Sequence, residues 1–223
     1  MVKAPKFTAR AQRTRQRILE AAEAHFSAKG LDGTRLEDIA EAIGIRRAAL
    51  FYYFRNKREL YAAVLSSVFG DLLDSIRAQL TARGPLPRRI ENAVSVWVEY
   101  VGKRPSLAKF VLREGAKASA DRKEIAEHIA AFLPLLQRVF EEGEREGHFH
   151  VKPIDPIHFA STIAWATVFF VGAVPNFVPN LPFDPISPEH LELHRREVIT
   201  ITRRLLGINA PRLTATRASR SRK

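Results

Sequence analysis

Apolar residues recur at helical spacing through most of this chain, and this periodicity restricts its fold more than any other feature. In one segment Leu60, Val64, Val68, Leu72 and Ile76 occupy every fourth position, which places them along one face of a helix. No segment shows a convincing alternation of apolar and polar residues, which is the pattern of a strand. The sequence therefore predicts an all-α protein.

Glycine and proline residues divide this pattern into helices of moderate length. Glycine favours the left-handed conformation that ends helices, and proline disrupts a helix interior. Gly30 and Gly44 are predicted to end the first two helices, and Pro134 to kink a later one. A proline-rich loop is expected after residue 173. The predicted helices cover residues 10–28, 34–43, 47–54, 57–81, 88–102, 105–116, 121–146, 156–173 and 188–206.

Thr34 and Glu37 have the spacing of a capping box at the start of the second helix. In that arrangement each side chain accepts a hydrogen bond from a backbone amide of the first turn. The sequence therefore predicts that the second helix starts at Thr34.

The composition excludes several classes of protein. The chain of 223 residues is long enough for an apolar core, and it contains no cysteine, which excludes disulfides, thiolate catalysis and cysteine-ligated metals. The basic N-terminus is followed by no apolar secretion signal, and the apolar stretch after Phe159 is too short and too diluted by polar residues for a membrane span. A cytoplasmic protein with no membrane partner is expected.

Positive charge is concentrated at the two ends of the chain. The formal net charge is +12, with 13 basic and 7 acidic residues in 1–60, and five basic and no acidic residues in 208–223. The segment 61–207 is nearly neutral. A basic end on a neutral body favours a polyanionic partner, nucleic acid before membrane. Residues 1–9 and 208–223 are predicted to be disordered, and the N-terminal arm either reaches along DNA or is a solvated tail.

The second and third predicted helices flank Gly44 and have the pattern of a helix-turn-helix, which places its second helix in the major groove of DNA. Such a unit needs an apolar inner face, an outer face of basic and hydrogen-bonding groups, and small residues that permit close approach to bases. The inner face is predicted to comprise Leu36, Ile39, Ile43, Leu50 and Phe54, and Ala48 and Ala49 are the small residues.

The run from Thr14 to Leu65 closely resembles the DNA-binding domain of the tetracycline-repressor (TetR) family. The matching residues include Ile18-Leu19, Phe26, Gly30, Gly33-Thr34, Leu36 to Ala40, Gly44, Leu50 to Phe54 and Lys57. The resemblance implies a helix-turn-helix domain over 10–56 and a helical effector-binding and dimerisation domain over 57–207. It also implies a repressor that an effector releases from a pseudo-palindromic operator in double-stranded DNA.

The resemblance implies the DNA-contacting residues. Arg47 and Ala48 align with base-reading positions, and most of the others with phosphate-contacting positions. Arg46 replaces a common serine, so the third helix lacks the usual small polar cap. The predicted DNA-binding residues are Arg35, Arg46, Arg47, Ala48, Phe51, Tyr52, Tyr53 and Lys57.

The last two long helices are predicted to form a homodimer. Their apolar residues exceed what one small domain readily buries, which favours an isologous four-helix interface over an internal core. The predicted interface residues are Phe159, Ala160, Ile163, Ala164, Val168, Val171, Leu191, Val198, Ile201 and Leu205.

An effector pocket is implied by the resemblance, and the alternative for each of its aromatic residues is ordinary core packing. Few polar groups lie near these residues, so the expected effector is a small, mainly apolar molecule that the sequence does not identify. The candidate residues are Trp97, Tyr100, Phe110, Arg113, His128, Phe132, Trp165 and Phe169.

No catalytic residues, metal ligands or cofactors are predicted. His148, His150 and His158 lack the spacing of a metal motif, and no phosphate-binding loop or nucleophile elbow occurs. Two alternatives stay open: a non-specific, nucleoid-like DNA-binding protein, and a helical small-molecule-binding protein whose helix-turn-helix is vestigial.

Overall fold

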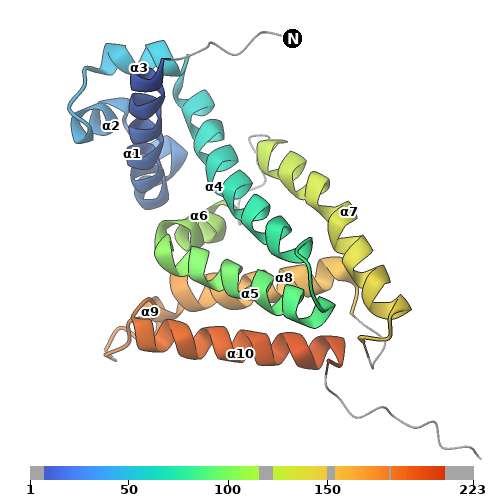
Figure 1. Ribbon diagram of the computed structural model, residues 1–223. Helices are drawn as coiled ribbons and strands as arrows, with labels where there is room; N and C mark the ends of the chain where they lie inside the picture. Colours follow the sequence, from blue (N-terminus) through green and yellow to red (C-terminus); the bar gives the residue numbers. More distant parts are fainter. Residues whose placement is uncertain (1–7, 116–122, 150–153, 181, 209–223) are drawn as a thin grey trace, which may run out of the picture.

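The computed structural model describes residues 8–115, 123–149, 154–180 and 182–208, with side chains omitted at 113–115 and 123–125. Every regular element in these ranges is a helix, which confirms the all-α prediction (Figure 1). The helices are α1 (Ala9–Gly33), α2 (Leu36–Ala42), α3 (Arg47–Tyr53), α4 (Lys57–Leu80), α5 (Leu86–Lys103), α6 (Pro105–Gly115), α7 (Lys123–Arg145), α8 (Pro156–Gly172), α9 (Val174–Phe177) and α10 (Pro188–Leu206).

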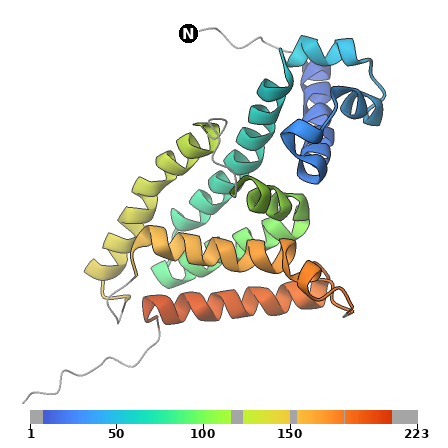
Figure 2. The same cartoon turned by 180° about the vertical axis from the view of Figure 1, so that it is seen from behind.

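The helices form two groups joined by α4. Helices α1, α2 and α3 cluster at one end of the molecule, and α4 runs from them into a larger body made of α5 to α10 (Figures 1 and 2). Helix α4 packs against α1, α5 and α7, whereas α5 lies against α10 and α8. A displacement of α4 would therefore change helix contacts in both groups.

The apolar core is continuous across the two groups. Tyr61 of α4 meets Phe26 of α1 edge to face, with ring centroids 5.0 Å apart, and stacks on Phe110 of α6 at 5.3 Å. All three side chains are buried. The domain boundary predicted between residues 56 and 57 therefore does not coincide with a division of the apolar core. A second cluster, centred on Val98, Val139 and Phe159, fills the far half of the body.

Local sequence signals account for the principal helix ends. Asn56, Asp155 and Ser187 each accept a backbone hydrogen bond in the first turn of α4, α8 and α10, as N-cap residues do. Gly207 adopts the left-handed conformation that ends α10, at φ 64°. Helix α7 continues through Pro134. The short α9 lies within the proline-rich segment predicted to be a loop.

The predicted capping box at Thr34 is wrong. Helix α2 begins at Leu36, and the buried Thr34 hydroxyl donates to the carbonyls of His25 and Gly30, at 3.1 and 2.6 Å. Gly30, at φ 74° and ψ 178°, breaks the α1 helix and leaves carbonyls without helical partners. The hydroxyl therefore satisfies the end of α1 instead of the start of α2.

The predicted terminal segments lie mostly outside the described residues. Three of their residues are described: Thr8 is the N-cap of α1, Ala9 begins α1, and Ile208 is buried in the second core cluster. The predicted tail boundary at 208 is therefore wrong by one residue, because an apolar side chain next to Gly207 packs back onto the body.

Candidate DNA interface and regulatory body

The helix-turn-helix is held by apolar packing and by polar ties between its helices. Ile39 of α2 and Leu50 of α3 are fully buried with Ile18 of α1. Gly44 makes the turn with φ 73°, a conformation that suits glycine. Arg17 donates to the carbonyl of Ile43 at 3.0 Å, so α1 also supports the carboxyl end of α2.

Helix α3 presents an exposed face of basic and aromatic side chains. Tyr52 is 70% exposed and Phe51 44% exposed, and Arg47 and Ala48 are also exposed. Tyr53 is half-buried and meets the Tyr52 ring edge to face at 4.9 Å. This face has the composition expected of a recognition helix in the major groove.

The amino end of α3 carries two arginines where a capping residue is usual. Arg46 occupies the N-cap position and makes no side-chain capping bond, as predicted. Arg47 instead pairs with Glu37 of α2, with Nη1 3.0 Å from Oε1. The Arg47 guanidinium also lies 5.6 Å from the centroid of the Phe51 ring.

Lys57 has a structural role that the sequence did not reveal. Its Nζ donates to the carbonyl oxygens of Asp32 and Thr34, at 3.2 and 3.0 Å. The ammonium thereby joins the start of α4 to the last turn of α1 and to the connection that follows it. Arg35, from the same connection, is exposed. The eight predicted DNA-binding residues thus lie on the connection before α2, on α3 with its N-cap, and at the first turn of α4.

A polar network connects the helix-turn-helix group to the body. Ser106 of α6 donates to Glu23 of α1 at 2.8 Å, and Arg104 lies 3.9 Å from the same carboxylate. Arg104 also donates to the Tyr100 hydroxyl at 2.9 Å, and that hydroxyl donates to the carbonyl of Val68 in α4 at 3.1 Å. Burial raises the pKa of Tyr100 above its usual value, so it remains a neutral donor.

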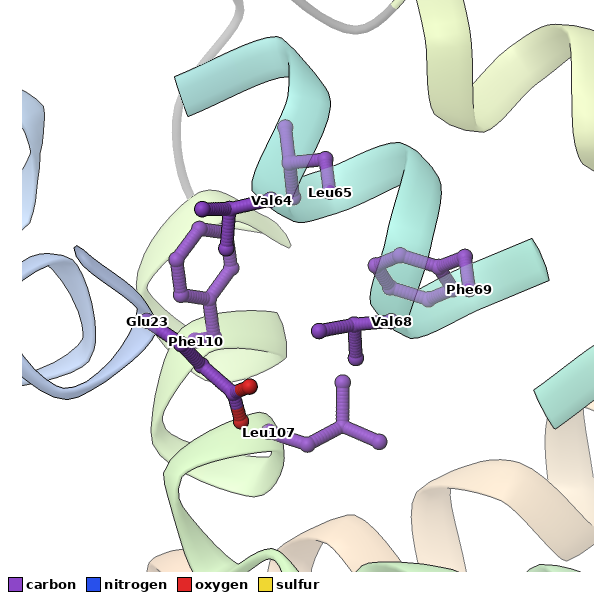
Figure 3. Close-up of a pocket in the computed structure, with 7 residues that line it drawn as sticks. All are labelled: Glu23, Val64, Leu65, Val68, Phe69, Leu107 and Phe110. Carbon is purple, nitrogen blue, oxygen red and sulfur yellow. The ribbon is translucent and has the colours of Figure 1, made fainter. Parts of the chain in front are cut away.

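Glu23 also borders a small apolar cavity between α1, α4 and α6 (Figure 3). Val64, Val68, Leu107 and Phe110 are among the apolar side chains around it. The cavity has a volume of about 10 Å³, which is room for roughly one water molecule and far less than a site that encloses a small molecule. In this conformation the cavity is a packing gap at the junction of the two groups.

The structure separates the predicted effector-binding residues into different environments. Trp97 packs against both core clusters, and its buried indole N–H makes no hydrogen bond within the described structure. His128 meets Ser66 of α4 at 3.0 Å, and Phe132 packs against the second cluster. Phe110 and Tyr100 contact the α1–α4–α6 junction described above. The Arg113 side chain lies outside the described residues.

Trp165 and Phe169 were predicted to line a pocket, and the structure contradicts this. The two side chains are 47% and 48% exposed on the outer face of α8. Phe169 stacks on Phe177 of α9, which is 72% exposed. At these positions of α8, both aromatic side chains point away from the side of the helix that packs against the core.

The predicted dimer interface also needs correction. Phe159, Ile163, Val168, Val171 and Val198 are buried within the single chain, because α5, α6 and α7 cover the inner face of α8 and α5 covers that of α10. Ala160, Leu191 and Leu205 pack against the same core, and Ala164 is half-buried. Of the predicted interface residues, Ile201 is exposed.

Another group of apolar side chains, which shares Ile201 with the predicted interface, is exposed on the body. It is formed mainly by α8 and α10 and by the loop between them. We call it the α8–α10 face. Its exposed apolar members are Ile157, Trp165, Phe169, Phe177, Ile186, Leu193 and Ile201.

The contacts and exposed positions of Glu23, Glu37, Phe177 and Leu193 were not predicted from the sequence. Spacing alone could have found Leu193, since it precedes Ile201 by two helical turns. The two glutamates carry no local signal, because their partners are distant in sequence.

Helices α8 and α10 are joined by a half-buried histidine. His194 stacks on Phe170 with ring centroids 4.0 Å apart, and its Nε2 lies 3.2 Å from the hydroxyl of the buried Thr167. Burial lowers the pKa of His194 to about 4, because desolvation disfavours the charged ring.

Within the described residues no group of three or more His, Asp or Glu residues is arranged to hold a metal ion. His148 and His158 each lie beside one carboxylate, of Glu146 and Asp155, at 3.2 Å. His150 is outside the described residues. Over the same part of the chain, no helix combines the length and the apolar character needed to cross a membrane.

Comparisons with known proteins agree with this architecture. A family model described as bacterial regulatory proteins, tetR family, matches residues 18–64. The HTH-type transcriptional regulator RutR of Escherichia coli (strain K12) is 30% identical over 160 residues, which cover 71% of this chain and 74% of RutR. The regulator TtgR of Pseudomonas putida is 48% identical over 58 residues, or 26% of this chain. Those residues span only 28% of the length of TtgR.

A solved structure shares the fold over most of the chain. It is a bacterial regulatory protein in the tetR family from Rhodococcus RHA1, with a TM-score of 0.69 and 20% sequence identity. The superposition covers 87% of this chain and 97% of that one. Taken with the match to RutR, the helix-turn-helix and the helical body identify this chain as a member of the tetR family of bacterial regulatory proteins.

Proposed function

We propose that the protein is a DNA-binding transcriptional repressor that a small, mainly apolar effector releases from its operator. The observation that carries this proposal is the exposed face of α3. Arg47, Ala48, Phe51 and Tyr52 lie exposed on a helix that Leu50 anchors in the core. A rigid helix with basic and aromatic groups outward suits the major groove.

The α8–α10 face supports a homodimer. Trp165 and Phe169 on α8 and Leu193 and Ile201 on α10 are exposed apolar side chains at helical spacing. Exposed apolar side chains on two helices that pack side by side are typical of a protein–protein interface, and two helices from each copy would form a four-helix arrangement. A pseudo-palindromic operator with half-sites about one helical turn apart requires such a pair.

Effector binding would be coupled to the DNA-binding helices through α4 and the polar network around Glu23. Helix α4 carries Lys57 at the DNA end and packs against α5 and α7 in the body. Ser106 and Arg104 tie the body to α1. An effector that is bound more tightly when α4 is displaced would shift the recognition helices away from the half-site spacing, and its differential affinity would limit the release.

Fluorescence anisotropy tests this function. The full-length protein is titrated against the DNA immediately upstream of its own gene and against a scrambled duplex, at two salt concentrations. Specific binding that survives moderate salt is expected, and Arg47→Ala should weaken it by about 1–3 kcal/mol. Equal, salt-labile binding of both duplexes would favour a non-specific DNA-binding protein instead.

A further inference from the structure

We propose that Glu37 is a positioning residue that holds Arg47 in the conformation in which it reads a base. The inference rests on the proposed function, because it assigns a role within the same recognition surface. It goes beyond it by giving a sequence-selecting role to an acidic residue on α2, the helix that precedes the recognition helix.

The geometry places the Arg47 guanidinium between two partners. The Glu37 carboxylate lies on one side, with Oε1 3.0 Å from Nη1, and the Phe51 ring lies 5.6 Å away on α3. Arg47 and Phe51 are one helical turn apart on α3, so the helical spacing alone brings the Phe51 ring beside the Arg47 side chain. Glu37 comes from the other helix of the motif and sets the direction of the side chain.

Stability alone does not account for this pair. The side chains of Arg47 and Glu37 are 56% and 43% exposed, and ion pairs this exposed contribute little to folding. Arg47 also stands at the amino end of α3, where the helix dipole disfavours a cation. A carboxylate at this place offsets that repulsion and lets an arginine occupy the first position of the recognition helix.

The arrangement suits a specific base contact. Arginine has five N–H donors and loses considerable side-chain entropy when it is ordered. Glu37 engages one nitrogen, which leaves other donors free for the two acceptors on the major-groove edge of guanine. The carboxylate also repels phosphates, so it weakens binding to DNA that does not offer the base contact.

The test compares Glu37→Gln with Glu41→Gln, a matched control. Glu41 is an exposed residue one turn further along α2, so its substitution removes the same charge away from Arg47. Wild type, both variants, Arg47→Ala and the double variant Glu37→Gln/Arg47→Ala each select binding sites from a library of random DNA duplexes. The selected site and its single-base variants are then titrated, and the melting temperature of each protein is measured.

Arg47→Ala identifies the base position that Arg47 reads. We expect Glu37→Gln to reduce discrimination at that position roughly tenfold, to strengthen binding to a scrambled duplex, and to have no further effect when Arg47 is already alanine. Glu41→Gln should retain the discrimination of the wild type.

Three results would overturn the proposal: full discrimination by Glu37→Gln, equal behaviour of the two glutamine variants, or a lost preference that accompanies a lowered melting temperature. Selection of no preferred sequence by the wild-type protein would refute the proposed function together with this inference. The two failures are therefore distinguishable.

Discussion

At the scale of single residues, Lys57 combines a structural and an electrostatic role. Its ammonium donates hydrogen bonds to the carbonyl oxygens of Asp32 and Thr34, two residues that follow the break in α1. Removing it leaves these acceptors with one partner fewer and removes a positive charge from the end of α4 that lies beside the helix-turn-helix. Stability and DNA binding should therefore change together at this residue.

We expect Lys57→Met to lower the free energy of unfolding by about 1–3 kcal/mol. It should also weaken binding to all DNA sequences alike and reduce the salt dependence by about one phosphate contact. Urea denaturation and anisotropy titrations at several salt concentrations measure the two effects. Arg83→Met, in the exposed turn at the far end of α4, is the control. A variant with unchanged stability would show that the carbonyl contacts contribute little.

Thr34 shows where local reasoning fails at this scale. The spacing of Thr34 and Glu37 fits a capping box, yet both side chains make other contacts: Thr34 with the end of α1, and Glu37 with Arg47. A related arrangement forms instead at α4. There the Asn56 side chain accepts from the amide of Glu59, and the Glu59 carboxylate accepts from the amide of Arg55.

At the scale of helices, the contact between α8 and α10 depends on a neutral histidine. His194 lies between Phe170 and Thr167, where a charged ring would lose solvation. The unfolded chain takes up a proton near pH 6.5 and the folded chain only near pH 4. Stability therefore falls as the pH drops below about 6.5, because protons favour the unfolded state.

We expect His194→Gln to flatten the dependence of stability on pH between 6.5 and 5, whatever it does to stability at pH 7. After a discount for the partial exposure of the ring, the wild-type loss in this interval is about 1 kcal/mol, or about 2–4 °C in melting temperature. Calorimetry at several pH values measures it. His158→Gln, at an exposed histidine of α8, should retain the wild-type slope, and an unchanged slope in His194→Gln would contradict the assignment.

At the scale of the whole molecule, α8 and α10 each have an inner and an outer side. The inner faces of α8 and α10 complete the core of one chain, and the exposed α8–α10 face presents large apolar side chains. Arg203 of α10 donates to the buried Glu91 of α5 at 2.9 Å, and this bond holds α10 against the body. The outer face is thus supported by a fixed framework, as an interface between two copies requires.

We expect Trp165→Glu to weaken dimerisation roughly a hundredfold, about 3 kcal/mol, because it would bury an unpaired charge. Ile129→Glu is the matched control, since Ile129 is an exposed apolar residue of α7. Analytical ultracentrifugation over a range of concentrations measures the association. If Trp165→Glu associates as the control does, the two copies meet through another surface.

The sequence by itself determined the helices, their approximate ends and the helix-turn-helix. These features depend on periodicity, capping residues and glycine or proline, all of which act over a few residues. The exposed residues of α3 could be predicted for the same reason, because Leu50 occupies the buried side of the helix and positions one or two residues away, such as Ala48, Phe51 and Tyr52, face other directions.

Only the tertiary structure decided which apolar face of a helix turns inward. Helix α8 is apolar nearly all round, so its pattern did not distinguish Phe159, in the core, from Trp165, on the surface. The ion pair of Glu37 with Arg47 and the contact of Glu23 with Ser106 were equally hidden. Each contact joins residues of different helices. The packing of those helices brings the side chains together, and no regular spacing in the sequence connects the residues.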